Sequence, residues 1–323
     1  MRTPPPVSGG AIEDVARELP RPGLGRLALL LDRPRVLGPL MLAPAGLYII
    51  LLVGVPLFFA IYLSMSNATT GSQTLQFVGP ANFVRAMQNS IFRSALANTF
   101  IFTIIAQTVV ILFGNILALV LQQKFWGRSV VRFLILLPWA TPISLAAIGW
   151  KWMFDSLYSV VNWMLKAVNI IGPTEFPQWL GVPSLAMASV IIVHVWRTFP
   201  FSAVVILAGL TSIPQEVIDA SAVDGATYFQ RVFYILLPML TPILAIALLF
   251  GTVFTFTDMG VVYILTNGNP FNSTHVLSSW AFQVGIIAGD LAQGAAVALF
   301  LLPVLLVGAI TLLRIASRAE TGV

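Results

Sequence analysis

Six apolar runs, each long enough to cross a lipid bilayer, restrict the fold of this chain more than any other feature. A helix needs about 20 apolar residues to span a hydrocarbon core of roughly 30 Å. Runs of this length lie at residues 37–64, 95–121, 130–153, 184–210, 233–257 and 292–313. Because a backbone in lipid must satisfy its own hydrogen bonds, each run is expected to be helical. The sequence therefore predicts an all-α polytopic membrane protein with about six transmembrane helices.

The composition supports a membrane protein and excludes several other classes. With 58% hydrophobic and 9% charged residues among 323, the chain has too few polar side chains to cover a soluble globule. The net charge of +5 does not indicate a nucleic-acid partner, because the basic residues lie at the ends of the apolar runs. The absence of cysteine excludes disulfides, thiolate metal sites and cysteine nucleophiles. We expect the lipid bilayer to be a partner, and no metal site.

The distribution of lysine and arginine predicts the orientation in the membrane. An even number of spans places both termini on one side, and basic residues mark the cytoplasmic side. They concentrate in the N-terminal tail, in the loop after the second run and near the C-terminus, at Arg2, Arg17, Arg21, Arg26, Arg33, Arg35, Lys124, Arg128, Arg132, Arg314 and Arg318. We predict a multi-pass protein of the cell (cytoplasmic or inner) membrane with both termini in the cytoplasm.

Three segments follow from these patterns. Residues 1–35 combine a proline triplet, glycine pairs and mixed charges, which predicts a flexible cytoplasmic tail with a short surface helix near 11–19. A cleavable signal peptide is not expected, because the first apolar run starts late and is too long for a signal core. Residues 36–318 are expected to form the transmembrane domain, and residues 319–323 a cytoplasmic C-terminal end.

Prolines are expected to interrupt some of the six spans, and a polar loop is expected to contain a short helix. Prolines inside the third, fourth and fifth runs predict kinks or breaks, because each removes a helix hydrogen bond; they are Pro138, Pro142, Pro200, Pro238 and Pro242. Between the first and second runs, the loop 67–93 predicts a turn followed by a short amphipathic helix on the outer surface.

A polar stretch at residues 212–238, between the fourth and fifth runs, predicts a helix, a turn and a second helix. Pro214 suits the first turn of a helix, where a missing N–H costs little. Gly225 can adopt the left-handed conformation that a tight reversal needs. Residues 220–222 give a small, closely approachable face. We call residues 212–238 the knob, and we expect a soluble partner to grip it from the cytoplasm.

The knob reads Asp219-Ala220-Ser221-Ala222-Val223-Asp224-Gly225-Ala226 and then Ile235-Leu236-Leu237-Pro238. This resembles the EAA motif of permease subunits in binding-protein-dependent ABC importers, E-A-A-x-x-D-G-A followed by I-x-L-P, with Asp in place of the leading Glu. The resemblance implies the type I ABC importer permease fold. It also implies that the knob couples the permease to an ATPase through Glu216, Asp219, Ala220, Ser221, Asp224, Gly225 and Ala226.

Two further motifs resemble the sugar-permease branch of this family, especially the substrate-holding subunit of the maltose importer. They are F-x-G-x-x-N-F at residues 77–83 and L-T-x-G-x-P at residues 265–270. The resemblance implies a subunit that translocates a sugar or sugar-like solute. Matched by register, it implies that the substrate contacts Trp139, Ile143, His194, Arg197, Thr198, Gly251, Thr255 and Asp258.

The chemistry of these residues suits a sugar, although it leaves alternatives open. Trp139 can stack on a pyranose face. His194, Arg197 and Asp258 lie within or at the edge of apolar runs, where a charge usually faces a cavity or a partner. Alternatively, Arg197 and Asp258 form an ion pair between helices, and His194 is a neutral interior histidine. Ile143 supplies no hydroxyl and departs from the maltose pattern, which argues against assuming maltose itself.

The chain contains no G-x-x-x-x-G-K-[ST] phosphate loop, so it is not expected to hydrolyse ATP or to bind a cofactor. The resemblance implies two ATP-binding cassette ATPase subunits that use ATP and Mg, a second permease subunit and an extracytoplasmic solute-binding protein.

Glycerol phosphate or another small polar solute is the alternative cargo, which Arg197 would suit. A second alternative is an ion-coupled secondary transporter, for which Asp258 is the plausible coupling residue and which would not use the knob. A third alternative is a membrane enzyme, which would need paired carboxylates or a His/Asp cluster at one membrane face; no such pair is recognised in the sequence.

Overall fold

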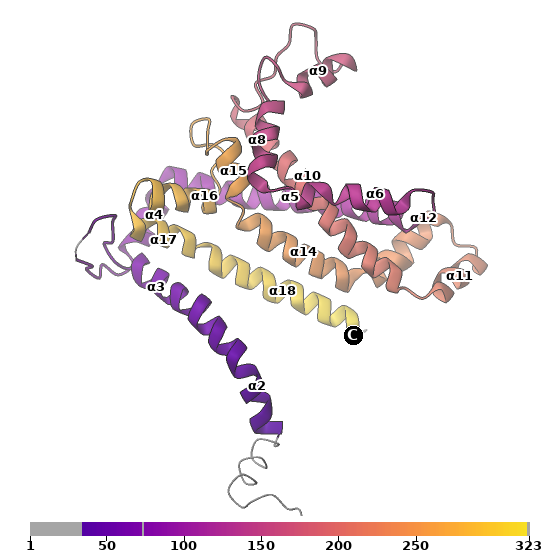
Figure 1. Ribbon diagram of the computed structural model, residues 1–323, viewed down its shortest axis with the longest axis horizontal. Helices are drawn as coiled ribbons and strands as arrows, with labels where there is room; N and C mark the ends of the chain where they lie inside the picture. The colour runs from indigo at the N-terminus through magenta and orange to yellow at the C-terminus, as the bar shows by residue number, and fades with distance from the viewer. Residues whose placement is uncertain (1–33, 73, 322–323) are drawn as a thin grey trace, which may run out of the picture. The chain divides into compact units, whose positions relative to one another are not determined.

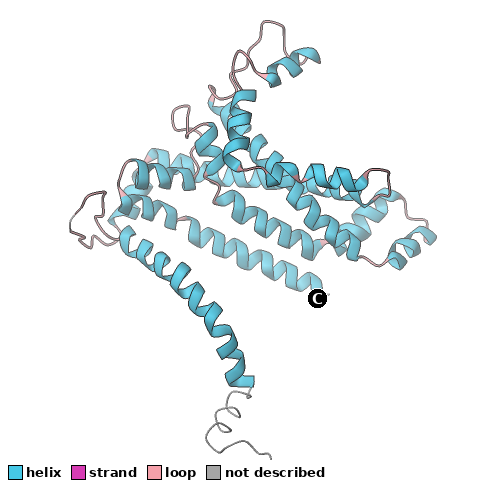
Figure 2. Cartoon of the chain, in the orientation of Figure 1, coloured by secondary structure: helices cyan, strands magenta, loops and turns pink. Residues whose placement is uncertain are grey.

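The computed structural model describes residues 34–72 and 74–321, and these residues are predominantly helical (Figures 1 and 2). Among them, extended backbone pairs only at one isolated bridge, between Ser66 and Phe77. The all-α prediction is confirmed. The predicted tail lies outside the described residues except for positions 34 and 35, and so does its expected surface helix at 11–19.

The described helices reproduce the six predicted spans, two of them as bent pairs. Four helices are long and apolar enough to cross a membrane without a break: Leu37–Ser64, Ser90–Gln122, Pro183–Ser212 and Leu291–Arg318. Two pairs reach that length together, Arg128–Ala140 with Ile143–Met153, bent by 91°, and Tyr228–Met239 with Thr241–Phe256, bent by 68°. Counting each pair as one span gives six.

The chain divides into two compact units, residues 1–60 and 61–323. The described helix of the first unit comprises α2 (Pro34–Ile49), a π-helical turn (Ile50–Gly54) and the start of α3 (Val55–Ser64). No side chain from Leu37 to Ala60 is buried. An apolar helix of this length suits a membrane span, because it satisfies its own backbone hydrogen bonds.

The second unit is built on four long helices, α5 (Ser90–Gln122), α10 (Pro183–Ser212), α14 (Thr241–Phe256) and α18 (Leu301–Thr321). α10 packs on α5 and α14, and α14 also packs on α18 (Figure 1). Small residues bring α5 and α10 together: a Cβ at Gly114 would lie 3.1 Å from Ser202 Oγ. Close contact through small residues is typical of packing between membrane helices.

Prolines break the third and fifth spans but not the fourth. The third span consists of α6 (Arg128–Ile135), α7 (Leu137–Ala140) and α8 (Ile143–Met153), and Pro142 directly precedes α8. The fifth begins as α12 (Tyr228–Arg231), a π-helical turn (Val232–Leu236) and α13 (Leu237–Met239) before α14. α10, in contrast, continues through Pro200. The predicted breaks are therefore found at two of the three proline-bearing spans.

The loop after the first span contains the expected short helix, α4 (Ala81–Gln88). Asn82 is buried, and its Nδ2 donates to the backbone carbonyls of Ser64 and Ser66 at 2.9 and 2.7 Å. Gly79 has a φ of +60°, which favours glycine. The Gly and Asn of the F-x-G-x-x-N-F motif thus reverse the chain and tie it back to the end of α3.

Further short helices complete the second unit: α9 (Val160–Ala167), α15 (Gly260–Leu265), α16 (Leu277–Phe282), a π-helical turn (Gln283–Ile287) and α17 (Leu291–Leu299). The L-T-x-G-x-P motif lies in the loop between α15 and α16. There Asn98 of α5 donates to the carbonyls of Ser273 and His275 at 2.7 and 3.0 Å. A Cβ at Gly268 would overlap the ring of His275, so this loop closes tightly around the imidazole.

We expect the protein to lose stability as the pH falls from about 6.5 towards 4, in part through His275. This residue lies between the fifth and sixth spans, and burial lowers its pKa to about 4 from 6.5. The unfolded chain therefore takes up the proton first, so the stabilisation is complete above pH 6.5 and is lost on acidification. Thermal unfolding of the purified protein at pH 7.0 and 4.5 tests this. His275→Gln should show a smaller drop, and an equal drop would contradict the assignment.

Candidate functional site

The knob folds as the predicted helix, turn and helix. α11 (Gln215–Val223) ends in a turn that Gly225 enters with a φ of +80°. The N–H groups of Gly225 and Ala226 close this turn on the carbonyls of Ala222 and Ser221, at 3.1 and 3.0 Å. Thr227 then caps α12 in a reciprocal capping box with Gln230. Both helix ends therefore have hydrogen-bond partners, and the turn is held in one conformation.

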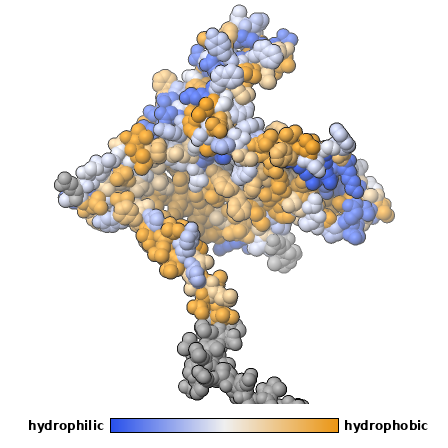
Figure 3. All heavy atoms as spheres, viewed as in Figure 1, coloured by the Kyte–Doolittle hydropathy of each residue, from blue (hydrophilic) through white to orange (hydrophobic). Residues whose placement is uncertain are grey.

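Most of the residues assigned to coupling lie on the surface of the knob. Glu216, Asp219, Ala220, Asp224 and Gly225 are exposed, Ala226 is half-buried, and Ser221 is buried. The hydroxyl of Ser221 donates to the carbonyl of Ile218 at 2.6 Å, so it holds α11 together. Hydrophilic residues gather at this end of the second unit (Figure 3). The exposed acids leave this surface free to contact a soluble protein.

Three of the predicted substrate residues meet in one buried charged cluster. Nδ1 of His194, on α10, lies 2.7 Å from Oδ2 of Asp258, which follows α14. The guanidinium of Arg197 approaches the same oxygen at 3.6 Å, and the N–H of Val261 donates to Oδ1 at 3.2 Å. His194 is fully buried and Asp258 is 7% exposed. Arg197 and Asp258 therefore pair with each other in this structure.

Threonine hydroxyls extend the cluster along the helices. Thr255 Oγ1 lies 2.9 Å from Nε2 of His194 and 2.8 Å from the carbonyl of Gly251. Thr198 donates to the carbonyl of His194 at 2.8 Å. Both threonines are buried. The side chain of Arg197 is 19% exposed, and its Nε has no hydrogen-bond partner among the described residues. The exposed part of the Arg197 side chain can therefore contact a ligand, whereas its Nε is buried.

The remaining predicted substrate residues lie among apolar neighbours. Trp139 stacks on Phe201 with ring centroids 4.6 Å apart and meets Phe254 edge to face at 6.0 Å. Ile143 packs against a core cluster, and a Cβ at Gly260 would lie 2.6 Å from its Cδ1. Trp139 therefore belongs to an aromatic cluster formed by the third, fourth and fifth spans.

One polar residue of the site was missed from the sequence. Nε2 of Gln107, on α5, donates to Thr255 Oγ1 at 2.6 Å. Its amide occupies the space in which a Cβ at Gly251 would lie. The available signal was a glutamine inside the apolar run 95–121, where an amide needs a buried partner. Gln107 joins α5 to the cluster on α10 and α14.

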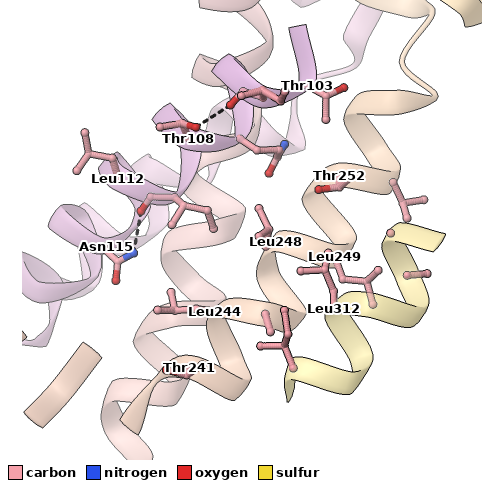
Figure 4. Close-up of a pocket in the computed structure, with 18 of the residues that line it drawn as sticks. Thr103, Thr108, Leu112, Asn115, Thr241, Leu244, Leu248, Leu249, Thr252 and Leu312 are labelled. Carbon is pink, nitrogen blue, oxygen red and sulfur yellow. Dashed lines mark hydrogen bonds between the residues drawn. The ribbon is translucent and has the colours of Figure 1, made fainter. Parts of the chain in front are cut away.

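An open groove of about 970 Å³ lies between α5, α14 and α18 (Figure 4). Its lining is largely apolar, and the few polar side chains include Thr108 and Asn115, which donate to their own helix at Ile104 and Ile111. None of the eight predicted substrate residues lines it. The groove offers a sugar few hydrogen bonds, so it is a poor site for a sugar.

Known proteins resemble this chain over most of its length. Residues 110–320 match the family of binding-protein-dependent transport system inner membrane components. The trehalose/maltose transport system permease protein MalF of Thermococcus litoralis is 32% identical, over 83% of this chain and 89% of its own length. The sulfoquinovosyl glycerol transport system permease protein SmoG of Agrobacterium fabrum is 33% identical, over 82% of this chain and 85% of its own.

The fold also matches a solved structure. A chain of the bacterial alginate ABC transporter, in complex with an alginate pentasaccharide-bound periplasmic protein, superposes with a TM-score of 0.75. The match covers 91% of this chain and 98% of that chain, at 22% identity. The type I permease fold expected from the knob is confirmed. The chain belongs to the family of binding-protein-dependent transport system inner membrane components, the permease subunits of ABC importers.

Proposed function

We propose that this permease imports a sugar or sugar-like solute across the cytoplasmic membrane, driven by ATP hydrolysis in a separate subunit. The observation that carries the proposal is the knob, a capped helical turn with exposed acids between two membrane spans. Relatives named for trehalose/maltose and sulfoquinovosyl glycerol transport support a carbohydrate cargo. The chain acts as a transport subunit and not as an enzyme.

The working assembly contains a second permease, two ATPases that bind ATP and Mg, and an extracytoplasmic solute-binding protein. Both termini lie in the cytoplasm, as the distribution of basic residues indicates. The ATPases bind the knob of each permease. Their closure shifts the two permeases as rigid bodies between inward-open and outward-open states. The binding protein biases this equilibrium because it engages one state more tightly than the other.

The charged cluster favours a neutral cargo over glycerol phosphate. The charges of Arg197 and Asp258 cancel each other, so this ion pair presents no net positive charge to an anion. Arg197, whose side chain is 19% exposed, can still donate to a hydroxyl or ring oxygen. Trp139 and Ile143 supply apolar surface for a sugar ring. Thr198, Gly251 and Thr255 complete the wall of the site.

Uptake by proteoliposomes that contain the whole complex tests this proposal. The panel comprises neutral mono- and disaccharides, polyols, a sulfonated sugar and glycerol phosphate. We expect ATP-dependent uptake of a neutral sugar, and a decrease of about tenfold or more for Arg197→Gln, the loss expected for a charged hydrogen bond. The matched control is Arg93→Gln, an exposed arginine near the start of α5. Uptake driven by a proton gradient without ATP would contradict the proposal.

A further inference from the structure

Four buried polar side chains form one continuous hydrogen-bonded chain across three helices. Gln107 Nε2 lies 2.6 Å from Thr255 Oγ1, which lies 2.9 Å from His194 Nε2. His194 Nδ1 lies 2.7 Å from Asp258 Oδ2. All four residues are at most 7% exposed. Such chains strengthen cooperatively when every member donates in the same direction.

The neighbours of Asp258 determine the direction of donation. The guanidinium of Arg197 and the N–H of Val261 can only donate, so both carboxylate oxygens act as acceptors. Nδ1 of His194 must then carry the proton that faces Oδ2. In the neutral ring, Nε2 is left as an acceptor, and the nearest donor to it is the hydroxyl of Thr255. That hydroxyl lies within donating distance of Nε2, at 2.9 Å.

Thr255 has one proton and two acceptors within reach, Nε2 of His194 and the carbonyl of Gly251 at 2.8 Å. Because Gln107 donates to the oxygen of Thr255, it occupies one lone pair and helps to hold Oγ1 within 2.9 Å of Nε2. Without Gln107, Oγ1 of Thr255 loses one of its three polar contacts, and its contact with Nε2 of His194 is expected to weaken. The amide of Gln107 thus helps to keep a hydrogen-bond partner at each ring nitrogen of His194.

We propose that Gln107 is a positioning residue for the substrate site, acting through Thr255 and His194 on the Asp258–Arg197 pair. The inference rests on the proposed function, because it assigns Gln107 the role of keeping Arg197, the partly exposed cation of the site, in place. Gly251 has a part in this, since a side chain there would overlap Gln107 Oε1. The glycine leaves room for the amide that starts the hydrogen-bonded chain.

Nitrogen-15 NMR of the histidine rings tests the proposal in the intact complex. The chain has two histidines, so the difference between spectra of the wild type and His194→Gln isolates the signal of His194. We expect a neutral ring protonated at Nδ1, with a hydrogen-bonded Nε2. In Gln107→Leu the Nε2 resonance should move downfield as that hydrogen bond is lost. A doubly protonated His194 in the wild type would overturn the proposal.

The substitution Gln107→Glu reverses the hydrogen bond between residue 107 and Thr255 and keeps the side chain at nearly the same size and shape. An ionised carboxylate only accepts, so Thr255 would donate to it and accept from Nε2 of His194. The ring should then become doubly protonated. The matched control is Thr103→Val, a buried position one turn earlier on α5 whose hydroxyl has no partner among the described residues. Its His194 spectrum should equal that of the wild type.

Uptake measurements complete the test. Gln107→Leu should lower the uptake rate about three- to tenfold, the range expected for one buried hydrogen bond, and Thr103→Val should leave it nearly unchanged. Unchanged His194 spectra in both Gln107 variants would overturn the proposal. The His194 spectra could instead agree with expectation while the complex transports no sugar. That result would refute the proposed function, and the hydrogen-bonded chain would still stand.

Discussion

Gly225→Val is expected to abolish solute uptake while the protein stays in the membrane at its normal level. The backbone of Gly225 has a φ of +80°, which a β-branched residue adopts only at a cost of about 1–3 kcal/mol. No heavy atom lies within 4 Å of a Cβ built at this position, so the effect is conformational and not a clash. The turn would open and redirect α11 away from the ATPase.

Gly225→Asn is the matched control, because asparagine enters the left-handed region more readily than valine and is also larger than glycine. We expect this variant to retain most of the uptake. Both variants would be compared by uptake in proteoliposomes and by the amount of protein in the membrane. Wild-type uptake by the valine variant would show that the conformation of this turn is not needed for coupling.

The second large effect is expected for Asp258→Leu, which should destabilise the complex by about 3–5 kcal/mol and stop uptake. The substitution leaves the Arg197 guanidinium without its carboxylate partner and removes the acceptor of His194 Nδ1. Thermal unfolding of the purified complex in detergent measures the stability. A complex as stable as the wild type would show that the cluster does not hold α10 to the end of α14.

The double variant Asp258→Leu/Arg197→Met separates stability from function. Removing both charges leaves no uncompensated cation, and replacing a buried pair by apolar residues is often neutral for stability. We expect the unfolding temperature to recover towards that of the wild type, whereas uptake stays low because the donor to the substrate is gone. Recovery of uptake with recovery of stability would show that Arg197 does not contact the solute.

The spans could be predicted from the sequence because length and apolar character suffice to define a membrane helix. The bends could be predicted only in part: the prolines predicted breaks in the third, fourth and fifth spans, and the structure has them in the third and fifth. Proline alone does not decide this: Pro142 lies in the 91° break between α7 and α8, whereas α10 continues through Pro200. Whether a helix survives a proline depends on how its neighbours satisfy the freed carbonyl.

The site was predictable to the extent that charge in an apolar span is conspicuous. His194, Arg197 and Asp258 stood out for that reason, and the structure brings them together. Gln107 did not stand out, because it is neutral and its partner Thr255 lies 148 positions away. Its role depends on the contact between α5 and α14, which a single sequence does not reveal. Likewise, the stacking of Trp139 on Phe201 requires the packing of two spans.

The central claim is that the knob couples this permease to a separate ATPase for sugar import. The most direct test is ATP hydrolysis by the complex purified with its ATPase and solute-binding protein, measured across the panel of sugars, polyols and phosphorylated solutes. We predict that the ATPase co-purifies and that one neutral sugar, with the binding protein, stimulates hydrolysis, and that Gly225→Val abolishes this stimulation. Absence of a co-purifying ATPase, or hydrolysis that no solute stimulates, would contradict the account.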